Sequence, residues 1–403
     1  MASFRSGRRG QVFAGLAIGG LVALTAACSS STKDSGTPAA APGSASGAGS
    51  SGASGSGASG SDIVAAAKAA VEKASGPNGT YVLPEPGPKA QKGKKVFVIT
   101  CGAAADACQV PAVNVQQAGA SLDWNVTIVD GKLSAAGYDA GIRQAIAAKA
   151  DGIVVVAIDC TSAKNAFLAA KAANIPVVGV YAYDCNDPMV GGPKLFAATI
   201  NSNGDPDAWA IANSQLRADY AIAKTDGKAK VISLNQPDFL VAKYWSKGFN
   251  DELAKCSSCK ISAAVDFTSN DLVGGGAPQK LATVLLKYPD ANVLFVTSDA
   301  LLQAVLPSIR NAHRPDLIVI ANEGFAATQQ LIRSGTVSAA VGIYSPWMGW
   351  SGADALNRVL AGQPTIPNEG LGYHLLTKDN LPSGTWAPSL DYQAAFKKMW
   401  AGA

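Results

Sequence analysis

The sequence predicts an α/β protein made of two lobes, each built on a doubly wound parallel sheet. The clearest sign is 152–185, in which two runs rich in β-branched residues, 152–160 and 175–185, flank a segment long enough for one crossover helix. Uninterrupted apolar runs are typical of strands that are buried on both faces of a parallel sheet. The same alternation of strand and helix occupies 94–200 and starts again beyond it, which indicates two halves of similar design.

The expected elements follow the chain in order. A run of Lys-Lys-Val-Phe-Val-Ile-Thr forms the first strand, and Pro111 suits the first turn of the helix after the loop 101–109. In the first half we expect strands at 94–100, 125–129, 152–160 and 175–185, and helices at 111–122, 136–150 and 163–174. In the second half we expect strands at 196–200, 230–234, 261–267, 293–297 and 317–321, with a helix at 206–223. Two such halves imply a cleft that both sets of strand ends face, and ligands of open α/β sheets bind beyond the carboxyl ends of strands.

The composition and charge exclude several classes of function. The chain of 403 residues carries a net charge of +4, and Arg5, Arg8 and Arg9 lie in a segment that we expect to be cleaved. The remainder is close to neutral, so no basic field indicates a nucleic-acid partner or an anionic membrane surface. With only His313 and His374, the chain has no zinc-ligand spacing and little provision for acid–base chemistry. We therefore expect no metal and no cofactor.

Residues 1–27 resemble a bacterial lipoprotein signal peptide. Three arginines precede the apolar core 12–24, and Thr-Ala-Ala stands directly before Cys28. In such signals the cysteine is lipidated and becomes the mature N-terminus, which implies a protein anchored to the outer face of the cell membrane by a lipid on Cys28. The apolar core is too short for a stable transmembrane helix. An ordinary secretory signal with an incidental cysteine is the alternative.

Two segments separate this signal from the folded halves. Residues 28–61 are almost wholly Ser, Gly, Ala, Pro and Thr, which bury too little apolar area to fold, so we expect a disordered tether. Within 62–93, the alanine-rich stretch 62–75 predicts a short helix with Asp62 as its N-cap, and 84–93 is a connector. A lipid followed by such a tether suggests that the folded part works just outside the membrane.

Six cysteines remain when Cys28 is set aside. In an exported protein six cysteines favour disulfides over metal or redox chemistry, and fifteen pairings are possible. The last two have the spacing of a thioredoxin active site, but they follow the charged end of a helix instead of opening one, so no helix N-terminus lowers a thiol pKa there. A structural disulfide is favoured over a redox site. The favoured pairs are Cys101–Cys108, Cys160–Cys185 and Cys256–Cys259.

An ordered series of short motifs resembles the periplasmic binding proteins of the ribose-binding, sugar type. Ala-Lys-Ala-Asp-Gly-Ile-Val begins at Ala148 before the third strand, and Ala-Asn-Ile-Pro-Val-Val begins at Ala173 before the fourth. Lys-Tyr-Pro-Asp, Asn-Glu-Gly at Asn322 and Ser-Gly-Thr-Val-Ser-Ala-Ala-Val at Ser334 follow in family order. The resemblance covers about 94–400, and the paired cysteines are similar to those of lipid-anchored members from Gram-positive bacteria.

This resemblance implies two lobes joined by a three-segment hinge, which close over a ligand. We expect the three crossovers near 199–203, 342–346 and 370–376. The N-terminal lobe is then 94–200 plus 345–372, and the C-terminal lobe is 201–344 plus 373–403. The implied partners are a small sugar-like ligand and the permease of an ABC importer, on which the closed form of a monomeric binding protein docks.

A sugar offers hydroxyl groups and apolar ring faces, so its site needs carboxylates, amides and aromatic planes. The resemblance places Lys243 and Glu323 where sugar binders carry Arg and Asp, and Ser298 and Tyr344 where they carry Asn and Gln. Where those proteins commonly carry an Asp-Arg pair, this chain has Tyr181 followed by alanine. The candidate ligand-binding residues are Asp159, Tyr181, Asp184, Lys243, Ser298, Asp299, Glu323 and Tyr344, with Tyr183, Phe239, Trp245 and Trp347 as further aromatic candidates.

Several of these candidates also have a purely structural explanation. Asp159, Asp184 and Asp299 also fit caps of helices or turns, because each follows a strand. Lys243 also fits a solvated helix surface. Glu323 is the strongest single candidate, since a strand-end glutamate followed by glycine has little use in packing.

The sequence indicates a binding protein, not an enzyme. The folded region contains no phosphate-binding loop and no nucleophile elbow. We interpret the chain as an extracytoplasmic solute-binding lipoprotein that captures a small polar ligand, a sugar or a related molecule, and delivers it to an ABC importer. Two alternatives stay open: the same fold used as a sensor for a membrane receptor, and an extracytoplasmic enzyme on an α/β scaffold.

Overall fold

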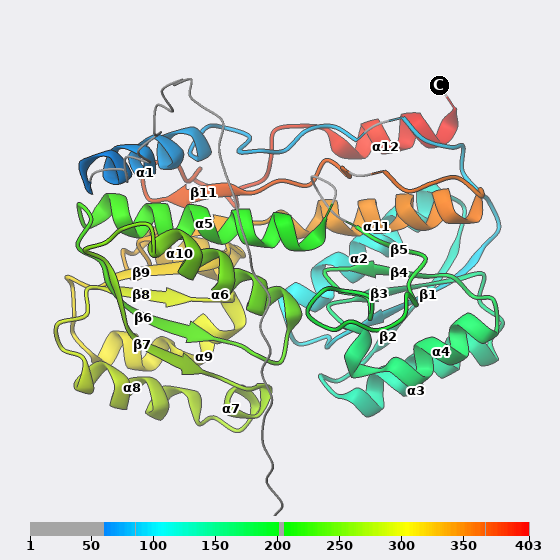
Figure 1. Cartoon of the computed structure of the whole chain (residues 1–403). Helices are drawn as coiled ribbons and strands as arrows, with labels where there is room; N and C mark the ends of the chain where they lie inside the picture. The colour runs from blue at the N-terminus through cyan, green and yellow to red at the C-terminus, as the bar shows by residue number, and fades with distance from the viewer. Residues whose placement is uncertain (1–59, 85, 201–204, 367, 403) are drawn as a thin grey trace, which may run out of the picture. The chain divides into compact units, whose positions relative to one another are not determined.

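The computed structural model describes residues 60–402 except 85, 201–204 and 367 (Figure 1). The expected signal peptide, Cys28 and nearly all of the expected tether therefore lie outside the described residues. Two largely parallel sheets organise the described chain, and each forms one lobe with helices on both faces. Within the described residues no helix is both long enough and apolar enough to span a bilayer. This architecture confirms the predicted fold of two α/β lobes.

The first lobe contains a five-stranded sheet, here called sheet A, in which all strands run parallel in the order β2-β1-β3-β4-β5. Its strands are β1 (Lys95–Thr100), β2 (Asn125–Asp130), β3 (Gly152–Val156), β4 (Val177–Val180) and β5 (Ala198–Thr199). In the register of the three central strands, Thr100 lies beside Val156 and Val156 beside Val180. The carboxyl ends of β1, β3 and β4 therefore lie at one edge of the sheet.

Both faces of sheet A are apolar because successive side chains of a strand point to opposite faces. In β1, Val96 and Val98 belong to the core cluster that includes residues of α2 (Asp106–Ser121) and α11 (Ser345–Leu360). Phe97 and Ile99 belong to a second cluster with residues of α3 (Ala135–Ala147) and α4 (Lys164–Ala172). All four of these β1 side chains are buried, which explains why the strand is an uninterrupted apolar run.

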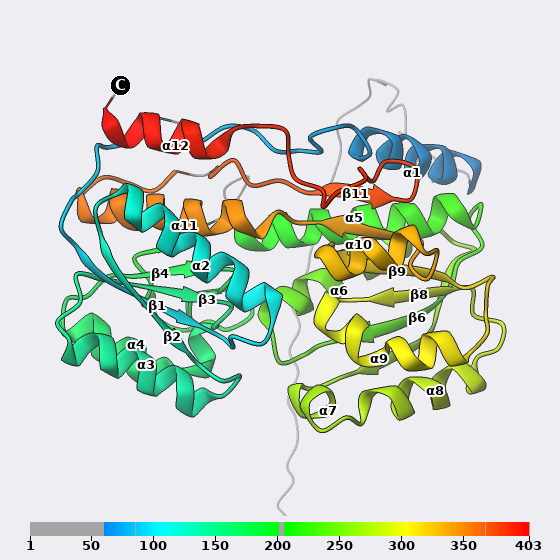
Figure 2. The same cartoon turned by 180° about the vertical axis from the view of Figure 1, so that it is seen from behind.

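The second lobe contains a six-stranded sheet, here called sheet B, in the order β11-β10-β9-β8-β6-β7. Its strands are β6 (Lys230–Asn235), β7 (Lys260–Asp266), β8 (Val293–Val296), β9 (Ile318–Glu323), β10 (Ala339–Gly342) and β11 (His374–Thr377). Only β11 is antiparallel to its neighbour among these strands. One face carries α5 (Pro206–Lys224) and α6 (Leu240–Leu253), and the other carries α8 (Ala277–Lys287), α9 (Asp299–Asn311) and α10 (Ala326–Arg333) (Figures 1 and 2).

The chain passes between the two sheets at the three places where crossovers are expected. It leaves β5 of sheet A for α5 of the second lobe through a segment that includes the undescribed residues 201–204. It returns from β10 of sheet B directly into α11 of the first lobe, and it leaves α11 again for β11 of sheet B. These passages form the hinge between the lobes.

Each terminal helix of the described chain packs on the lobe opposite to that of the strand next to it in sequence. Helix α1 (Gly60–Ala74) precedes sheet A in sequence, but it lies along α5 of the second lobe (Figures 1 and 2). Helix α12 (Tyr392–Ala401) follows sheet B, but it packs on α11 of the first lobe, where Trp400 stacks on Trp350 with ring centroids 5.6 Å apart. The expected second-lobe segment 373–403 is therefore divided between the lobes, with β11 in sheet B and α12 on the first lobe.

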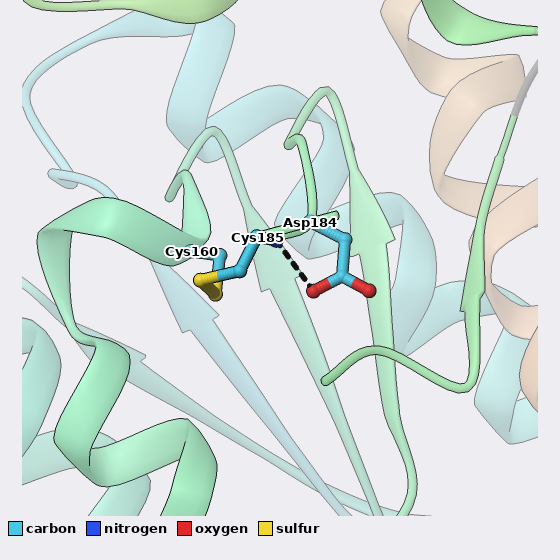
Figure 3. A group of neighbouring side chains, drawn as sticks. All are labelled: Cys160, Asp184 and Cys185. Atoms are coloured by element: carbon cyan, nitrogen blue, oxygen red, sulfur yellow. Dashed lines mark hydrogen bonds between the residues drawn. A yellow bond between two sulfur atoms is a disulfide. The ribbon is translucent and has the colours of Figure 1, made fainter. Parts of the chain in front are cut away.

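Within the described residues three disulfides are present, and they join the three pairs that the sequence analysis favours. Cys101–Cys108 closes the loop after β1, Cys160–Cys185 links the segments after β3 and β4, and Cys256–Cys259 closes the turn between α6 and β7. The Cα atoms of the pairs lie 5.1–5.3 Å apart, which is within the usual range for a disulfide. Figure 3 shows Cys160–Cys185 at the carboxyl end of sheet A.

One expected helix begins earlier in the structure. α2 starts at Asp106 and not at Pro111, so the proline lies inside the helix. Cys108 consequently belongs to the first turns of α2, and its disulfide ties that turn to Cys101 at the end of β1. The hydroxyl of Thr100 donates a hydrogen bond of 2.7 Å to the Cys108 carbonyl. The prediction that the helix begins at Pro111 was therefore wrong. The disulfide and the Thr100 hydrogen bond stabilise an additional helical turn before the proline.

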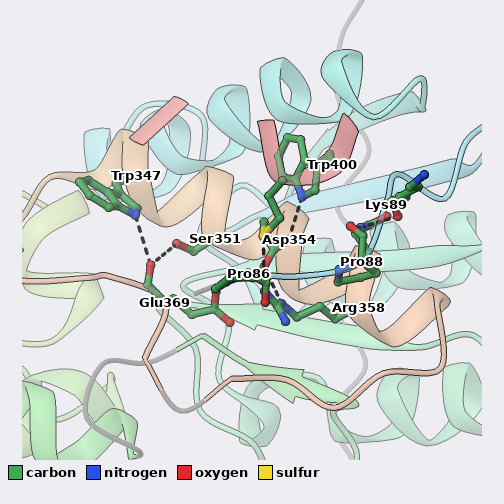
Figure 4. Close-up of polar contacts among 11 residues, drawn as sticks. Pro86, Pro88, Lys89, Trp347, Ser351, Asp354, Arg358, Glu369 and Trp400 are labelled. Carbon is green, nitrogen blue, oxygen red and sulfur yellow. Dashed lines mark hydrogen bonds and ion pairs between the residues drawn. The ribbon is translucent and has the colours of Figure 1, made fainter. Parts of the chain in front are cut away.

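An N-terminal strap, residues 80–93, connects α1 on the second lobe to β1 in the first. Its backbone is bonded to the hinge, since the Val82 N–H donates to the Gly370 carbonyl. It is bonded to the first lobe further on, since the Gln91 N–H donates 2.8 Å to the Asn357 side chain and Arg358 donates 3.1 Å to the Pro86 carbonyl (Figure 4). The strap therefore crosses between the lobes alongside the segment that joins α11 to β11.

Candidate functional site: a cavity between the lobes

A cavity of about 110 Å³ lies between the carboxyl-terminal ends of the two sheets. Strand ends contribute side chains to it from both lobes: Asp159 and Tyr181 follow β3 and β4, while Ser298 and Glu323 lie at the ends of β8 and β9. The complete lining is Cys101, Ala105, Ala107, Cys108, Leu133, Ala157, Asp159, Tyr181, Gln236, Phe239, Val241, Ala242, Trp245, Ser269, Leu272, Val273, Ser298, Ala300 and Glu323. The cavity thus occupies the place where α/β sheets bind ligands.

Three strand ends at this cavity have a backbone conformation that is unusual for residues with side chains. The φ angles of Ala157, Tyr181 and Glu323 are 52°, 58° and 57°, all in the left-handed region. A non-glycine residue costs of the order of 1–2 kcal/mol there. Such local strain clusters at functional sites, where the surrounding structure holds it in place. The conformation turns the chain sharply at the end of each strand and brings these side chains to the cavity wall.

Direct hydrogen bonds join the two lobes beside the cavity. The Tyr181 hydroxyl of the first lobe donates to Glu323 Oε1 of the second over 3.3 Å. Asp159 accepts the N–H of Leu240, at the start of α6, through Oδ2 at 2.8 Å, and it accepts the N–H of Tyr183 through Oδ1 at 3.0 Å. The Tyr181–Glu323 and Asp159–Leu240 bonds form only when the lobes are close, so the structure represents a closed arrangement of the cleft.

A second set of contacts closes the cleft nearer to the hinge. The Tyr244 hydroxyl of α6 donates to the carboxylate of Asp187 in the first lobe, with oxygen–oxygen distances of 2.8 and 3.0 Å. The ring of Tyr244 stacks on Tyr183, with centroids 5.3 Å apart. The sequence analysis did not single out Tyr244 or Asp187, because nothing in their spacing indicates that they meet across the lobes.

Glu323 and Asp299 form a buried acidic pair at the second-lobe wall. Glu323 Oε2 accepts the backbone N–H of Asp299 at 2.7 Å, and Asp299 Oδ2 accepts the N–H of Phe325 at 2.8 Å. Burial away from water raises the pKa of both carboxyl groups. The backbone N–H groups oppose that shift, because they stabilise the ionised form.

Arg217 lies behind this acidic pair, and the sequence analysis missed it. Its guanidinium donates 3.2 Å to the Val296 carbonyl and lies 4.6 Å from the centroid of the Phe295 ring. Burial lowers the pKa of Arg217 to about 9, and the neighbouring acidic groups Glu323 and Asp299 oppose that shift. Its position in the sequence could have indicated that it is buried, because it falls on the face of α5 that packs against sheet B.

Gln236 is a second cavity residue that the sequence analysis missed. It lies just after β6, and its Oε1 accepts hydrogen bonds from the hydroxyls of Ser298, at 2.5 Å, and Thr297, at 3.3 Å. These two bonds fix the orientation of the amide. Glutamine after a strand is common in turns, so its identity gave no reason to prefer it over its neighbours.

The structure brings four of the eight expected ligand-binding residues to the cavity, namely Asp159, Tyr181, Ser298 and Glu323. It does not bring Lys243 there, because this side chain is exposed on α6. Tyr344 lies in an aromatic cluster instead, with its ring 6.0 Å from that of Tyr392. Asp299 is the first residue of α9, behind Glu323 and outside the lining.

Asp184 differs from its expected placement because its carboxylate is already used by the backbone. Its oxygens accept the N–H group of Cys185 at 2.7 Å (Figure 3). They also accept the N–H groups of Leu195 and Phe196 at 2.9–3.0 Å. Asp184, Cys185 and Cys160 lie close enough together to suggest a metal site. The two sulfur atoms are joined in a disulfide, so the group has the chemistry of a structural cross-link.

Among the other aromatic candidates, Phe239 and Trp245 line the cavity from the second lobe. Trp347 does not: it stacks on Tyr392 with centroids 4.6 Å apart, and its indole N–H donates to the Glu369 carbonyl. Tyr183 donates its hydroxyl to the Pro206 carbonyl over 3.1 Å near the hinge. The aromatic side of the cavity is therefore supplied mainly by α6 and the residues before it.

Comparison with known proteins agrees with this two-lobed geometry. The profile of the periplasmic binding protein domain matches residues 96–364. The chain belongs to the periplasmic binding protein family. Among curated proteins, this periplasmic binding protein is 20% identical to the ribose import binding protein RbsB of Escherichia coli (strain K12) over 249 residues, which are 62% of this chain and 78% of that protein.

Solved structures of periplasmic binding proteins share the fold at low sequence identity. One is an ABC transporter solute-binding protein from Agrobacterium vitis bound with alpha-D-tagatopyranose, with 18% identity, a TM-score of 0.62, and coverage of 72% of this chain and 97% of that one. Another, from Burkholderia graminis C4D1M in complex with D-arabinose, has 21% identity, a TM-score of 0.61, and coverage of 74% and 100%. A glucose-galactose binding protein from Geobacillus stearothermophilus has 18% identity, a TM-score of 0.61, and coverage of 72% and 100%.

Proposed function

We propose that this periplasmic binding protein is an extracytoplasmic solute-binding lipoprotein that captures a small uncharged molecule by lobe closure and delivers it to the permease of an ABC importer. The observation that carries the proposal is the cavity between the carboxyl ends of two sheets, with hydrogen bonds that join the lobes beside it. Capture in such a cleft needs no cofactor and no covalent step. The protein acts as a monomer in this proposal.

The relatives make sugars and related molecules the first ligands to test. Their names refer to ribose, tagatopyranose and D-arabinose. In the present chain, Asp159, Tyr181, Ser298 and Glu323 are the candidate contacts to the ligand, because they line the cavity and come from both lobes. A ligand that contacts both lobes stabilises the closed form through its differential contacts, which is the requirement for any shift between two conformations.

A role in binding, without catalysis, is supported by the way the polar groups of the cleft are used. Asp159 and Glu323 each accept two hydrogen bonds from the protein itself, and the Tyr181 hydroxyl donates to Glu323. A catalytic acid or base needs a free position toward a substrate. These groups instead hold the two lobes together.

The lipid anchor on Cys28 completes the proposal and has its own test. A lipid on the outer face of the cell membrane, followed by the tether 28–61, holds the two lobes near a permease. Replacing Cys28 by Ala is expected to release the protein from membranes into the medium. Membrane retention of the Cys28→Ala variant equal to that of the wild type contradicts the anchor.

The central experiment measures lobe closure in solution. We expect a cognate ligand to raise the melting temperature by mass action and to decrease the radius of gyration in small-angle X-ray scattering. D-Ribose, D-arabinose, D-tagatose, myo-inositol and small neutral non-sugars form the test panel. A tightly bound ligand that leaves the radius of gyration unchanged contradicts capture by lobe closure.

A further inference from the structure

We propose that the cleft selects a single-ring, largely apolar and uncharged molecule that carries one hydrogen-bond acceptor, in preference to a polyhydroxylated sugar. This inference rests on the proposed function, because it names the class of ligand for the same cleft. It is drawn from the chemistry of the cavity wall, the engagement of most of its polar groups, the donors left over, and the size and rim of the cavity.

The wall of the cavity is mostly apolar. Tyr181 apart, thirteen of its nineteen residues have aliphatic or aromatic side chains or form the Cys101–Cys108 disulfide. The disulfide and the small side chains Ala105 and Ala107 form the first-lobe side, opposite Phe239 and Trp245 of the second lobe. A flat ring between such surfaces buries apolar area on both of its faces, which is the main source of affinity in sites of this kind.

Three polar groups at the wall, those of Asp159, Glu323 and Ser298, are already bonded to the protein in the closed form. Both oxygens of Asp159 accept backbone N–H groups, and both oxygens of Glu323 accept bonds, from Tyr181 and from the N–H of Asp299. The Ser298 hydroxyl donates to Gln236 and accepts from the backbone. Each of these carboxylate oxygens has given one of its acceptor sites to the protein, so the many hydroxyl groups of a sugar would find few free partners here. An unsatisfied buried hydroxyl is unfavourable.

Two donors at the wall remain available: the indole N–H of Trp245, which is buried without a hydrogen-bond partner among the described residues, and the amide of Gln236. Because Gln236 Oε1 accepts from Thr297 and Ser298, the amide is oriented and its Nε2 has hydrogens to donate. Within the described part of the chain, Nε2 donates to no other atom. An acceptor on the ligand, such as a carbonyl oxygen, fits this position.

The size and the rim of the cavity agree with a single ring. An apolar cavity of roughly 150 Å³ accommodates benzene, and the closed cavity here measures about 110 Å³. Two large apolar side chains of its lining are exposed, one from each lobe: Leu133 is 39% exposed and Val273 is 76% exposed. Their position gives an apolar ligand a favourable contact with both lobes as the cleft closes.

The test uses the mature protein and probes of defined chemistry. Acetophenone and benzaldehyde present one ring and one acceptor, toluene presents the ring alone, and D-ribose and D-tagatose present hydroxyl groups. Dissociation constants come from titrations monitored by tryptophan fluorescence and by isothermal calorimetry. We expect saturable binding of the two aryl carbonyls, at least fivefold weaker binding of toluene, and no saturation by either sugar at the same concentrations.

Two substitutions locate the binding in the cavity. Ala107→Leu adds a larger side chain to the cavity wall and is expected to weaken the binding of acetophenone at least tenfold. Ala120→Leu makes the same change on the exposed surface of the same helix, α2, and is expected to leave the affinity unchanged. Gln236→Leu removes the amide donor and is expected to abolish the preference for acetophenone over toluene.

The outcomes separate this inference from the proposed function. Saturable binding of a sugar with closure, together with no binding of the aryl carbonyls, overturns the ligand class and leaves capture by lobe closure intact. Binding of acetophenone that is insensitive to Ala107→Leu, or no binding of any aryl carbonyl, also overturns the ligand class. Ligand binding of any class without a decrease in the radius of gyration contradicts the proposed function itself.

Discussion

Two groups of buried acidic side chains, one in the cleft and one behind it on the first lobe, differ in where their partners come from. In the cleft, Glu323 is bonded by Tyr181 of the other lobe. Behind the first lobe, Asp354 is bonded within that lobe: it forms an ion pair of 2.7 Å with Arg358 one turn along α11, and it accepts 2.8 Å from the indole of Trp400 (Figure 4).

This difference distinguishes contacts that form only when the lobes close from contacts that are present whether the cleft is open or closed. The hydrogen bonds of Asp354 and Arg358 described above join α11 to α12 and to Pro86 in the first-lobe part of the N-terminal strap, and none of these bonds joins the two lobes. The bonds of Glu323 and Asp159 across the cleft exist only when the lobes are close. A buried charge with all its partners on one lobe stabilises the fold, whereas one with a partner on the other lobe stabilises a particular conformation.

The largest effect is expected from breaking the permanent pair. Arg358→Met leaves Asp354 buried without its cation, and removing one partner of a buried ion pair costs about 3–5 kcal/mol of the free energy of unfolding. Both side chains are at most 4% exposed, so water cannot compensate. Urea denaturation followed by circular dichroism measures the loss.

A surface pair provides the control for this substitution. Arg143 and Asp139 have the same i, i+4 spacing and the same order along a helix, but their side chains are 53% and 38% exposed. Arg143→Met is expected to change the free energy of unfolding by less than about 0.5 kcal/mol. Equal losses for the two substitutions would show that Arg358 is not part of a buried network.

The second effect is a pH dependence that arises in the cleft. Burial raises the pKa of Asp159 to about 6 from an ordinary value near 3.8. The folded form therefore holds this proton more tightly than the unfolded chain, and the resulting stability is complete below about pH 4 and lost as the pH rises through about 6. A shift of about two pKa units corresponds to at most about 3 kcal/mol.

The measurement is the free energy of unfolding between pH 4 and pH 7.5. Asp299 and Glu323 act in the same direction, since burial raises the pKa of both. The side chain of the Asp159→Asn variant cannot ionise, so the free energy of unfolding of this variant is expected to fall less over this range than that of the wild type. The variant is expected to be less stable than the wild type at each pH, because it loses an acceptor for the N–H of Tyr183 or Leu240. A wild-type stability that rises across this window contradicts the burial of the ionisable cleft.

The fold could be predicted from the sequence because its strands are uninterrupted runs of β-branched residues at regular spacing. The placement of α1 and α12 could not, since an apolar helix face does not specify which lobe it packs on. Trp350 and Trp400, which stack across α11 and α12, are far apart in the chain and carry no local sign of the contact.

The candidate site was predictable where it consists of strand ends and unpredictable elsewhere. Asp159 and Asp184 look alike in sequence, each preceding a cysteine after a strand. Asp159 follows β3 by three residues and reaches the cavity, whereas Asp184 follows β4 by four and is captured by the N–H groups of Leu195 and Phe196. The path of the backbone after the strand determines which of the two aspartates reaches the cavity, and the residue type does not indicate that path. Arg217 lies behind Glu323 and belongs to a helix, so no strand-end rule selects it.

The smallest effect is expected from removing one hydroxyl between the lobes. Tyr181→Phe deletes the donor to Glu323 Oε1, and a single hydrogen bond to a charged group contributes about 1.5–3 kcal/mol at most and less when the distance is 3.3 Å. Because this bond joins the lobes, its loss is expected to favour the open form, so that the radius of gyration of the ligand-free protein increases while the free energy of unfolding falls by about 1 kcal/mol or less.

Tyr220→Phe distinguishes the loss of a bond between lobes from the loss of any tyrosine hydroxyl bond. The Tyr220 hydroxyl donates 3.2 Å to the Ser338 carbonyl, and both residues belong to the second lobe. This substitution is expected to lower the stability to a similar extent without changing the radius of gyration. If both variants expand the ligand-free protein equally, the expansion reflects general loosening, and the Tyr181–Glu323 bond does not control closure. If Tyr181→Phe alone expands the ligand-free protein, the hydrogen bond between Tyr181 and Glu323 stabilises the closed form, whereas the bond within the second lobe does not.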